Sequence, residues 1–154
     1  LEIGTAIGYS AIWLAGISPR VQVDSIEKDE ARYQQALDFI KKAGLEERIT
    51  LHWADAKDYA DQLQGAYDVL FIDAAKGQYQ LFFEQYSPLL KRGGLVISDN
   101  VFFRGYVAEE SIENKRLAPL VNKLKKYNLW LKEHPQFDTS FIPIGDGLAL
   151  SIKR

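Results

Sequence analysis

Apolar and polar residues follow two repeating patterns along the chain, and together these patterns predict strands that alternate with helices. Residues 21–27 (VQVDSIE) alternate between apolar and polar side chains, which indicates a strand. Residues 67–73 (YDVLFID) and 94–100 (GLVISDN) are almost continuously apolar, as in strands that a parallel sheet buries on both faces. The expected strands are residues 1–3, 21–27, 48–53, 67–73 and 94–100. The expected helices are residues 10–16, 28–44, 78–90 and 111–133, with a short helix around residues 59–63.

The helix expected at residues 28–44 has a clear apolar side and a clear end. Ala36, Phe39 and Ile40 share one face of this helix. Gly44 suits the position just past a helix end, because glycine readily adopts the backbone conformation found there.

The second half of the chain contains further stop signals. The Gly93-Gly94 pair is expected to end the helix at residues 78–90, and Pro135 to limit the last helix. The tail is expected to form two strands joined at Gly145-Asp146-Gly147, which is a hairpin signal. The predicted fold class is α/β, a doubly wound and mostly parallel sheet with an antiparallel C-terminal hairpin, in a single domain over residues 1–154.

Composition limits the possible functions. The chain has 154 residues with a net charge of −2, so global charge gives no support to a nucleic-acid or membrane partner, although a local patch remains possible. The absence of cysteine excludes disulfides, thiolate metal sites and cysteine nucleophiles, and it fits the cytoplasm. No apolar run approaches the ~18 residues of a membrane span. Because the sequence lacks methionine and opens within a strand, we expect N-terminal sequence to be missing.

Acidic residues stand at the end of every expected parallel strand, where open α/β sheets bind their ligands. The first turn has Gly4 and Gly8, but Ala6 stands where a dinucleotide site needs its second glycine. A turn without that motif, preceded by Glu2, suits a cofactor that has a positive charge and no phosphate. S-adenosylmethionine fits this description, and Glu27 is placed to accept hydrogen bonds from ribose hydroxyls. The alternative is an ordinary strand–helix turn followed by a solvated acid.

Asp73 and the Asp99-Asn100 pair follow the two most apolar strands. If those strands are neighbours, they lie ~5 Å apart and the three side chains can converge on one Mg²⁺ or Mn²⁺ ion. The alternative is that the aspartates cap the segments that follow them. Lys76 is a candidate general base in such a site, or else an ordinary surface lysine. The sequence offers no acid partner for either histidine, so we assign neither a chemical role.

Cations gather in the last third of the chain despite the negative net charge. Arg104 follows the expected metal ligands and is a candidate RNA contact together with Lys125 and Lys126. The other interpretation is the solvated side of an amphipathic helix. The basic residues expected on the helical stretch are Lys115, Arg116, Lys123, Lys125, Lys126 and Lys132.

Four segments of the chain resemble the motifs of one enzyme family in order: LEIGTAIGYSAIWLA, SIEKDE, FIDAAKGQY and LVISDN. They are similar to those of the cation-dependent class I O-methyltransferases, which include catechol and caffeoyl-CoA O-methyltransferases. The segments SDNVFFRGYVAE and YNLWLKEHPQFDTSFIPIGDGLALSIKR resemble the bacterial tRNA 5-hydroxyuridine methyltransferases in particular. The resemblance spans essentially the whole chain and implies a Rossmann-like class I methyltransferase fold.

The resemblance also implies roles for individual residues. Glu2, Gly4, Thr5 and Ser10 would line the methionine end of S-adenosylmethionine, and Glu27 would hold its ribose. Asp55 and Ala56 would flank the adenine of the cofactor. Asp73 would contact the cofactor as well as the metal. The metal, Mg²⁺ or Mn²⁺, would be bound by Asp73, Asp99 and Asn100, and Lys76 would be the catalytic lysine.

The family has helices ahead of the first motif that this chain lacks, and its members suggest a cytoplasmic homodimer. The implied reaction is methylation of 5-hydroxyuridine at the tRNA wobble position to 5-methoxyuridine. An O-methyltransferase of small catechol-like or phenolic substrates is the alternative. An NAD-dependent oxidoreductase and a non-catalytic α/β binding module remain as further alternatives.

Overall fold

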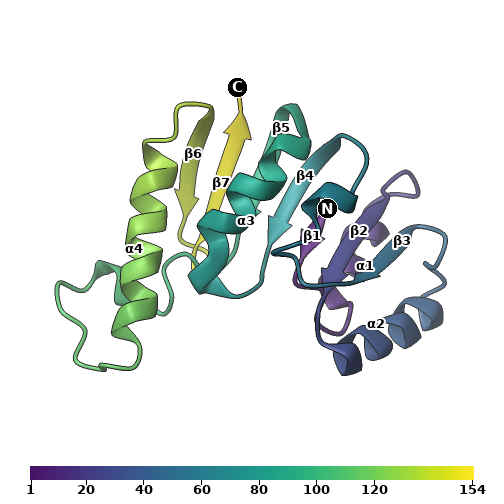
Figure 1. Cartoon of the computed structure of the whole chain (residues 1–154), viewed down its shortest axis with the longest axis horizontal. Coiled ribbons are helices and arrows are strands. Elements are labelled where there is room, and N and C mark those ends of the chain that lie inside the picture. Colours follow the sequence, from purple (N-terminus) through teal and green to yellow (C-terminus); the bar gives the residue numbers. More distant parts are fainter. The chain divides into compact units, whose positions relative to one another are not determined.

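The computed structural model describes residues 1–154, which divide into two compact units, residues 1–64 and residues 65–154. In both units strands alternate with helices, as the sequence predicts (Figure 1). None of the helices is long and apolar enough to cross a membrane.

The first unit contains three parallel strands in the order β3-β2-β1. Its central strand β2 pairs residue by residue with β3, from Val23 opposite Ile49 to Glu27 opposite Trp53. The carboxyl ends of β2 and β3 therefore lie at one edge, where the candidate cofactor residues are found. Its elements are β1 (Glu2–Ile3), α1 (Tyr9–Gly16), β2 (Val23–Glu27), α2 (Glu30–Lys42), β3 (Ile49–Trp53) and the short η1 (Ala60–Gln62).

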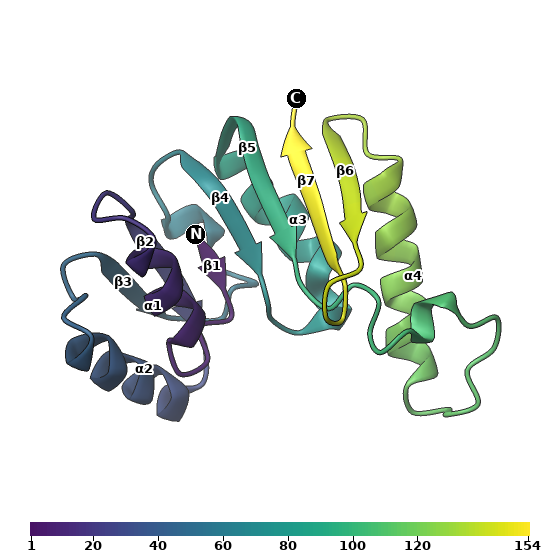
Figure 2. The same ribbon diagram turned by 180° about the vertical axis from the view of Figure 1, so that it is seen from behind.

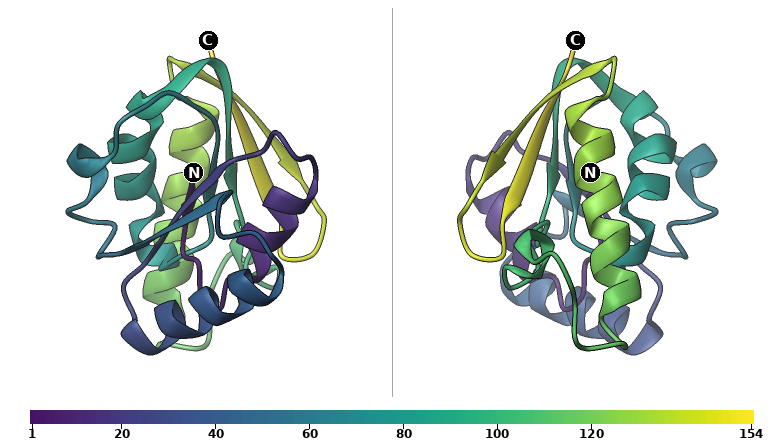
Figure 3. Two further views of the ribbon diagram at one scale, coloured as in Figure 1. Left: turned by 90° about the vertical axis from the view of Figure 1, so that its right-hand side faces the viewer. Right: turned by 90° about the vertical axis from the view of Figure 1, so that its left-hand side faces the viewer.

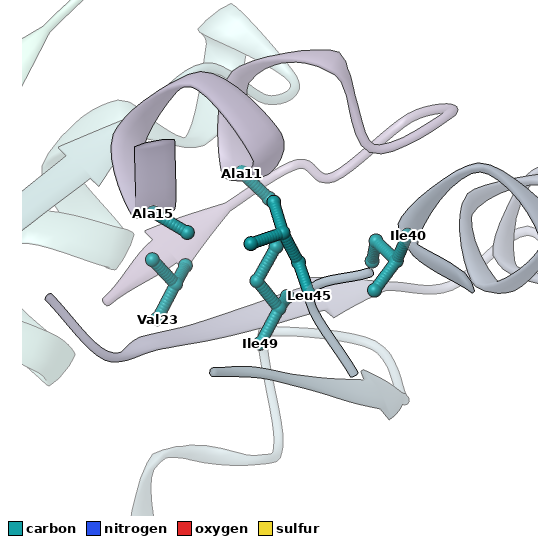
Figure 4. Close-up of a cluster of buried hydrophobic side chains, with 6 residues drawn as sticks. All are labelled: Ala11, Ala15, Val23, Ile40, Leu45 and Ile49. Carbon is teal, nitrogen blue, oxygen red and sulfur yellow. The ribbon is translucent and has the colours of Figure 1, made fainter. Parts of the chain in front are cut away.

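Side chains from both helices and two strands of the first unit meet in one apolar cluster (Figure 4). The cluster consists of Ala11, Ala15, Val23, Ile40, Leu45 and Ile49. On the apolar face of α2, Ala36 and Ile40 are buried, whereas Phe39 is 41% exposed. Gly8 allows a close approach here, since a Cβ on it would lie 3.3 Å from the Cβ of Ala36.

The second unit has four strands in the order β4-β5-β7-β6. Strands β4 and β5 are parallel, whereas β7 runs antiparallel to both β5 and β6, so the predicted hairpin is confirmed. Helices α3 and α4 lie on the same face of these strands (Figure 3), where Phe83 packs edge-on against Tyr127 and Trp130. The elements are β4 (Tyr67–Ile72), η2 (Lys76–Gln78), α3 (Tyr79–Tyr86), η3 (Ser87–Leu89), β5 (Leu90–Ser98), η4 (Tyr106–Ala108), α4 (Ala118–Lys132), β6 (Phe137–Ile142) and β7 (Leu148–Lys153).

Helix α4 is shorter than predicted, because it begins at Ala118 and not near residue 111. Pro119 lies in the first turn of α4. Proline is tolerated there because the N–H groups of a first turn have no partner within the helix, and because no earlier turn is present for its ring to clash with. The residues ahead of it form turns, in which Asn114 accepts backbone hydrogen bonds from Leu117 and Ala118. Lys115 and Arg116 therefore do not lie on the helix, which corrects the expected run of cations.

The Gly93-Gly94 pair also has a different place from the one expected. Helix α3 ends at Tyr86, a short turn containing Pro88 follows, and both glycines lie within β5. The β4–β5 register is irregular there, because Tyr67 lies opposite Leu90 but Val69 lies opposite Leu95. A Cβ on Gly94 would lie 2.8 Å from the carbonyl oxygen of Lys91, so this irregular strand segment requires glycine.

Gly147 should be much less tolerant of alanine than Gly145 in the same turn. Gly147 has φ +86°, and a Cβ on it would lie 2.3 Å from Cδ2 of Phe102. We expect Gly147→Ala to lower the free energy of unfolding by about 2–4 kcal/mol, from left-handed strain plus overpacking. Gly145→Ala, at φ +57° with nothing within 4 Å, should cost only about 1 kcal/mol in urea unfolding. Equal losses would contradict the contact.

Candidate functional site

Strands β4 and β5 lie side by side (Figure 2), and Asp73 and Asp99 are the residues that directly follow them. Strands β4 and β5 pair in parallel with Ile72 opposite Ser98, and the Asp99 backbone N–H donates to the Ile72 carbonyl at 3.1 Å. The prediction that these two strands are neighbours is confirmed. Because the pairing extends to the last strand residues, both carboxylates leave the sheet at the same level.

The electrostatics of Asp73 show that the two carboxylates interact. Burial raises the pKa of Asp73, and the Asp99 carboxylate raises that pKa further, whereas the Lys76 ammonium lowers it. Two like charges held together at a sheet edge destabilise one another unless a cation lies near them. No group of three or more His, Asp or Glu side chains converges here, so any metal would need the Asn100 amide oxygen as a third protein ligand.

The loop after β5 holds Asn100 in a rare backbone conformation. Asn100 has φ +53°, and its backbone N–H donates to the Asp99 carboxylate at 2.6 Å. Phe103 and Arg104 also have positive φ values, of +43° and +56°. Asparagine tolerates this conformation better than most residues, whereas phenylalanine and arginine rarely adopt it. Three of the chain's four positive-φ residues other than glycine thus follow this strand end.

Helix α4 and the β6–β7 turn fix that loop in place. Asn128 of α4 donates from Nδ2 to the carbonyl oxygen of Val101 at 2.9 Å, and the Val101 N–H donates to the carbonyl of Gly147 at 3.0 Å. One residue before Asp99, the Ser98 hydroxyl is hydrogen-bonded at 2.7 Å to the hydroxyl of Tyr127. The sequence did not predict these supporting residues, since nothing in their spacing distinguishes them from core residues.

The first turn is organised around the carboxylate of Glu27, which is only 7% exposed. This carboxylate accepts backbone hydrogen bonds from Ala6 at 2.8 Å, Lys28 at 3.0 Å and Asp29 at 2.9 Å. The Ala6 amide, which a dinucleotide-binding turn would offer to a pyrophosphate, therefore faces a negative charge. This arrangement disfavours the oxidoreductase alternative and leaves lone-pair capacity on Glu27 for a neutral or cationic ligand.

A buried polar network lies beneath the same turn. Glu2 is fully buried, and its two carboxylate oxygens accept hydrogen bonds from the hydroxyls of Ser10 and Ser25. Because Ser25 donates its only hydroxyl hydrogen to Glu2, Thr5 is the donor in the 2.5 Å contact between the Thr5 and Ser25 hydroxyls. The network ties β1, α1 and β2 together and brings Glu2, Thr5 and Ser10 to one place, while Gly4 donates to the Ile26 carbonyl at 3.1 Å.

The end of β3 places Asp55 and Ala56 in a tight turn. Asp55 accepts a hydrogen bond from the Lys57 backbone N–H at 3.1 Å, and Ala56 is buried.

In the strand β3 itself, His52 has hydrogen-bond partners that the sequence did not reveal. Its Nε2 lies 2.7 Å from Oδ1 of Asp24, and its Nδ1 lies 3.0 Å from the Tyr59 hydroxyl.

The side chains of the candidate RNA contacts differ in their exposure and in their hydrogen bonding. Arg104 and Lys126 are exposed, whereas Lys125 is half-buried and donates from Nζ to the Glu109 carbonyl. Lys123 lies over the loop that follows β4, since its Nζ lies 3.5 Å from the position of a Cβ on Gly77. An additional ammonium group is therefore close to Lys76 and the Asp73 turn.

Comparison with known proteins identifies the family. The sequence model of one family, described as O-methyltransferase, matches residues 1–154. The chain belongs to the O-methyltransferase family. A caffeoyl-CoA O-methyltransferase of Populus kitakamiensis is 33% identical over a match that spans 97% of this chain and 67% of the plant protein.

Two crystal structures support the same conclusion. A Staphylococcus aureus protein, provisionally assigned as a caffeoyl-CoA O-methyltransferase, matches with a TM-score of 0.95 and 41% identity over 99% of this chain and 74% of that protein. The O-methyltransferase of Bacillus cereus in complex with SAH (S-adenosylhomocysteine) matches with a TM-score of 0.87 and 28% identity, over 99% of this chain and 72% of that one. The predicted Rossmann-like fold is confirmed, and the chain is an S-adenosylmethionine-dependent O-methyltransferase.

Replacing Asp73 of this O-methyltransferase by asparagine should stabilise the cation-free protein at neutral pH. The native pKa of Asp73 is raised above its ordinary value of 3.8, so its ionised form opposes folding, and an amide removes that penalty. The gain should disappear as pH falls below 3.8, where Asp73 is protonated in both the native and the unfolded state.

Thermal unfolding in excess chelator, from about pH 3 to pH 8, measures this gain in Asp73→Asn. Asp38→Asn, on the exposed side of α2, is the matched control and should show no comparable gain. A variant less stable than the wild type at neutral pH would contradict the raised pKa of Asp73.

Proposed function

We propose that this O-methyltransferase methylates an acidic hydroxyl with the help of a divalent cation, and that its substrate is 5-hydroxyuridine at the wobble position of tRNA. The observation that supports the cation is the pair of neighbouring carboxylates, in which Asp99 raises the pKa of Asp73. The tRNA substrate is supported by the resemblance of the second half of the chain and by the exposed cations near this pair.

Asp73, Asp99 and Asn100 are the proposed ligands of Mg²⁺ or Mn²⁺. Two carboxylates and one amide oxygen form a hard donor set, which suits these ions and leaves positions for other oxygen ligands. A cation bound there would favour the ionised form of a substrate hydroxyl. It would also remove the repulsion between the two aspartates, so the residues present fit the ion.

S-adenosylmethionine is proposed to bind along the strand ends of the first unit. When bound, it supplies an electrophilic methyl group on a sulfonium. Glu27 would accept a hydrogen bond from the ribose, while Gly4 and Ser10 would lie at the methionine end, held in place by the buried Glu2 and Thr5. Asp55 and Ala56 are proposed for the adenine, and Asp73 for a contact near the reacting atoms.

Lys76 is the proposed proton acceptor. It lies three residues after Asp73, is half-buried, and is close enough for its ammonium to lower the pKa of that carboxyl. In the proposed step, Nζ of Lys76 is the atom that would take the proton of the substrate hydroxyl. A bound S-adenosylmethionine would supply the methyl group to that oxygen and would leave as S-adenosylhomocysteine. The protein contributes mainly by positioning and by electrostatic stabilisation.

Exposed cations in the second half of the chain are the proposed contacts for the phosphates of tRNA. Arg104 and Lys126 are the exposed candidates for phosphate contacts, and Lys123 lies over the Gly77 turn. Lys125 can contribute less, because one of its ammonium hydrogens is already donated to the Glu109 carbonyl. A base in a single-stranded loop can enter a pocket without opening a duplex. This assignment implies a cytoplasmic enzyme, and a homodimer is part of the same proposal.

A small phenolic substrate is the second candidate. It is favoured by the relative from Populus kitakamiensis, whose name specifies caffeoyl-CoA. Such a substrate also carries an acidic hydroxyl, so the chemistry of Asp73, Asp99 and Lys76 would be the same. Only the groups that recognise the remainder of the substrate would differ.

Glu27→Ala should weaken the binding of S-adenosylmethionine by about 1–3 kcal/mol, the usual scale of a lost hydrogen bond to a charged group. Titration calorimetry with the cofactor measures this effect. Glu30→Ala, which removes an exposed acid three residues further along the chain, is the matched control and should leave the affinity unchanged. Equal affinities of the wild type and Glu27→Ala would exclude Glu27 from the cofactor site.

The substrate and the cation are tested together by methyl transfer with the full-length protein. Labelled cofactor is supplied with tRNA from a strain that lacks the enzyme, in parallel with catechol and caffeoyl-CoA. We expect label in 5-methoxyuridine, at least a tenfold loss in excess chelator, and recovery with Mg²⁺.

Each part of the proposal has its own contrary result in this assay. Label only in catechol or caffeoyl-CoA would replace the tRNA assignment by the small phenolic substrate. Full transfer in excess chelator would refute the cation, whatever the substrate.

A further inference from the structure

The hydroxyl of Tyr79 is a buried polar group without a hydrogen-bond partner. Tyr79 is only 1% exposed, and its Oη is enclosed by the protein. Buried polar groups are usually hydrogen-bonded, so each exception calls for an explanation, such as a ligand or a role in a site. Phenylalanine would fill the same apolar space without leaving a polar atom unpaired.

Tyr79 lies directly beside the candidate cation site. It is the first residue of α3, six positions after Asp73 and three after Lys76. Its ring packs edge-on against the ring of Tyr127 at 5.7 Å, and the Tyr127 hydroxyl is hydrogen-bonded to Ser98, the residue before Asp99. Through Tyr127, the Tyr79 ring is therefore connected to the strand end that carries Asp99.

The carboxylates act on the Tyr79 hydroxyl electrostatically. Burial raises the pKa of Tyr79 most, and Asp73 and then Asp99 raise it further. The neutral Tyr79 phenol has one hydrogen to donate. The two aspartates are the acceptors whose charges act on this hydroxyl. Tyr127 differs, since its hydroxyl already has Ser98 as a partner.

We propose that Tyr79 is a positioning residue whose hydroxyl donates a hydrogen bond to the Asp73 carboxylate when a divalent cation is bound. This inference rests on the proposed function, because it requires the cation site. Carboxylates that bind a metal are themselves held by hydrogen bonds, which fix their orientation. Tyr79 would supply that hydrogen bond from beneath the site, without touching the substrate.

The test compares Mn²⁺ binding by the full-length wild type and Tyr79→Phe, from the electron paramagnetic resonance signal of free Mn²⁺. We expect the variant to bind Mn²⁺ about tenfold more weakly, as for other residues that orient metal ligands. Its melting temperature without cation should equal or exceed that of the wild type, because an unpaired buried hydroxyl is removed. A purely structural role would change the melting temperature and leave the affinity alone.

Tyrosine absorption provides a second readout that does not depend on activity. Adding Mg²⁺ to the wild type should perturb the near-ultraviolet tyrosine spectrum, and Tyr79→Phe should lose that perturbation. Tyr33→Phe, which removes the hydroxyl of a ring stacked on Trp53 in the first unit, should retain both the perturbation and the Mn²⁺ affinity.

The possible failures can be distinguished. If the wild type binds Mn²⁺ and Tyr79→Phe binds it equally well, the positioning role is wrong while the cation site stands. If the wild type itself binds no Mn²⁺, the cation site and the role of Tyr79 are both wrong.

Discussion

The parallel pairing of β4 and β5 is the constraint on which the candidate site depends. It continues to the last residue of each strand, with Ile72 opposite Ser98, so Asp73 and Asp99 must leave the sheet side by side. The sheet thereby holds two like charges together: burial raises the pKa of Asp73, and the neighbouring Asp99 carboxylate raises it further. Such an arrangement opposes folding in the absence of a cation, which is the usual price of a preformed metal site.

In the first unit, a carboxylate has the opposite effect on its surroundings. Glu27 accepts three backbone hydrogen bonds, so its charge stabilises the first turn in the absence of any ligand. A turn whose amide already faces a carboxylate is poorly suited to phosphate, which agrees with membership of the O-methyltransferase family. The first unit thus offers a carboxylate that is stabilised without a ligand and keeps lone-pair capacity for one, and the second unit offers acidic ligands in need of a cation.

Local signals predicted the strand ends well and the supporting contacts poorly. Asp73 and Asp99 could be placed because apolar runs end directly before them, and parallel strands share an edge. The predicted start of α4, near residue 111, was wrong. The residues before Pro119 have a helical pattern, but proline is favoured in the first turn of a helix, and α4 begins at Ala118. The contacts of Tyr79 and Asn128 depend on tertiary packing, and those of His52 on the pairing of β2 with β3, which no spacing in the sequence reports.

The most direct test of the central claim is a crystal structure of the full-length enzyme with Mn²⁺ and S-adenosylhomocysteine, with data collected for manganese anomalous scattering. The account predicts one anomalous peak about 2.1 Å from carboxylate oxygens of both Asp73 and Asp99 and from the amide oxygen of Asn100. Cofactor product bound with no peak at these residues, or a peak that excludes either aspartate, would contradict it.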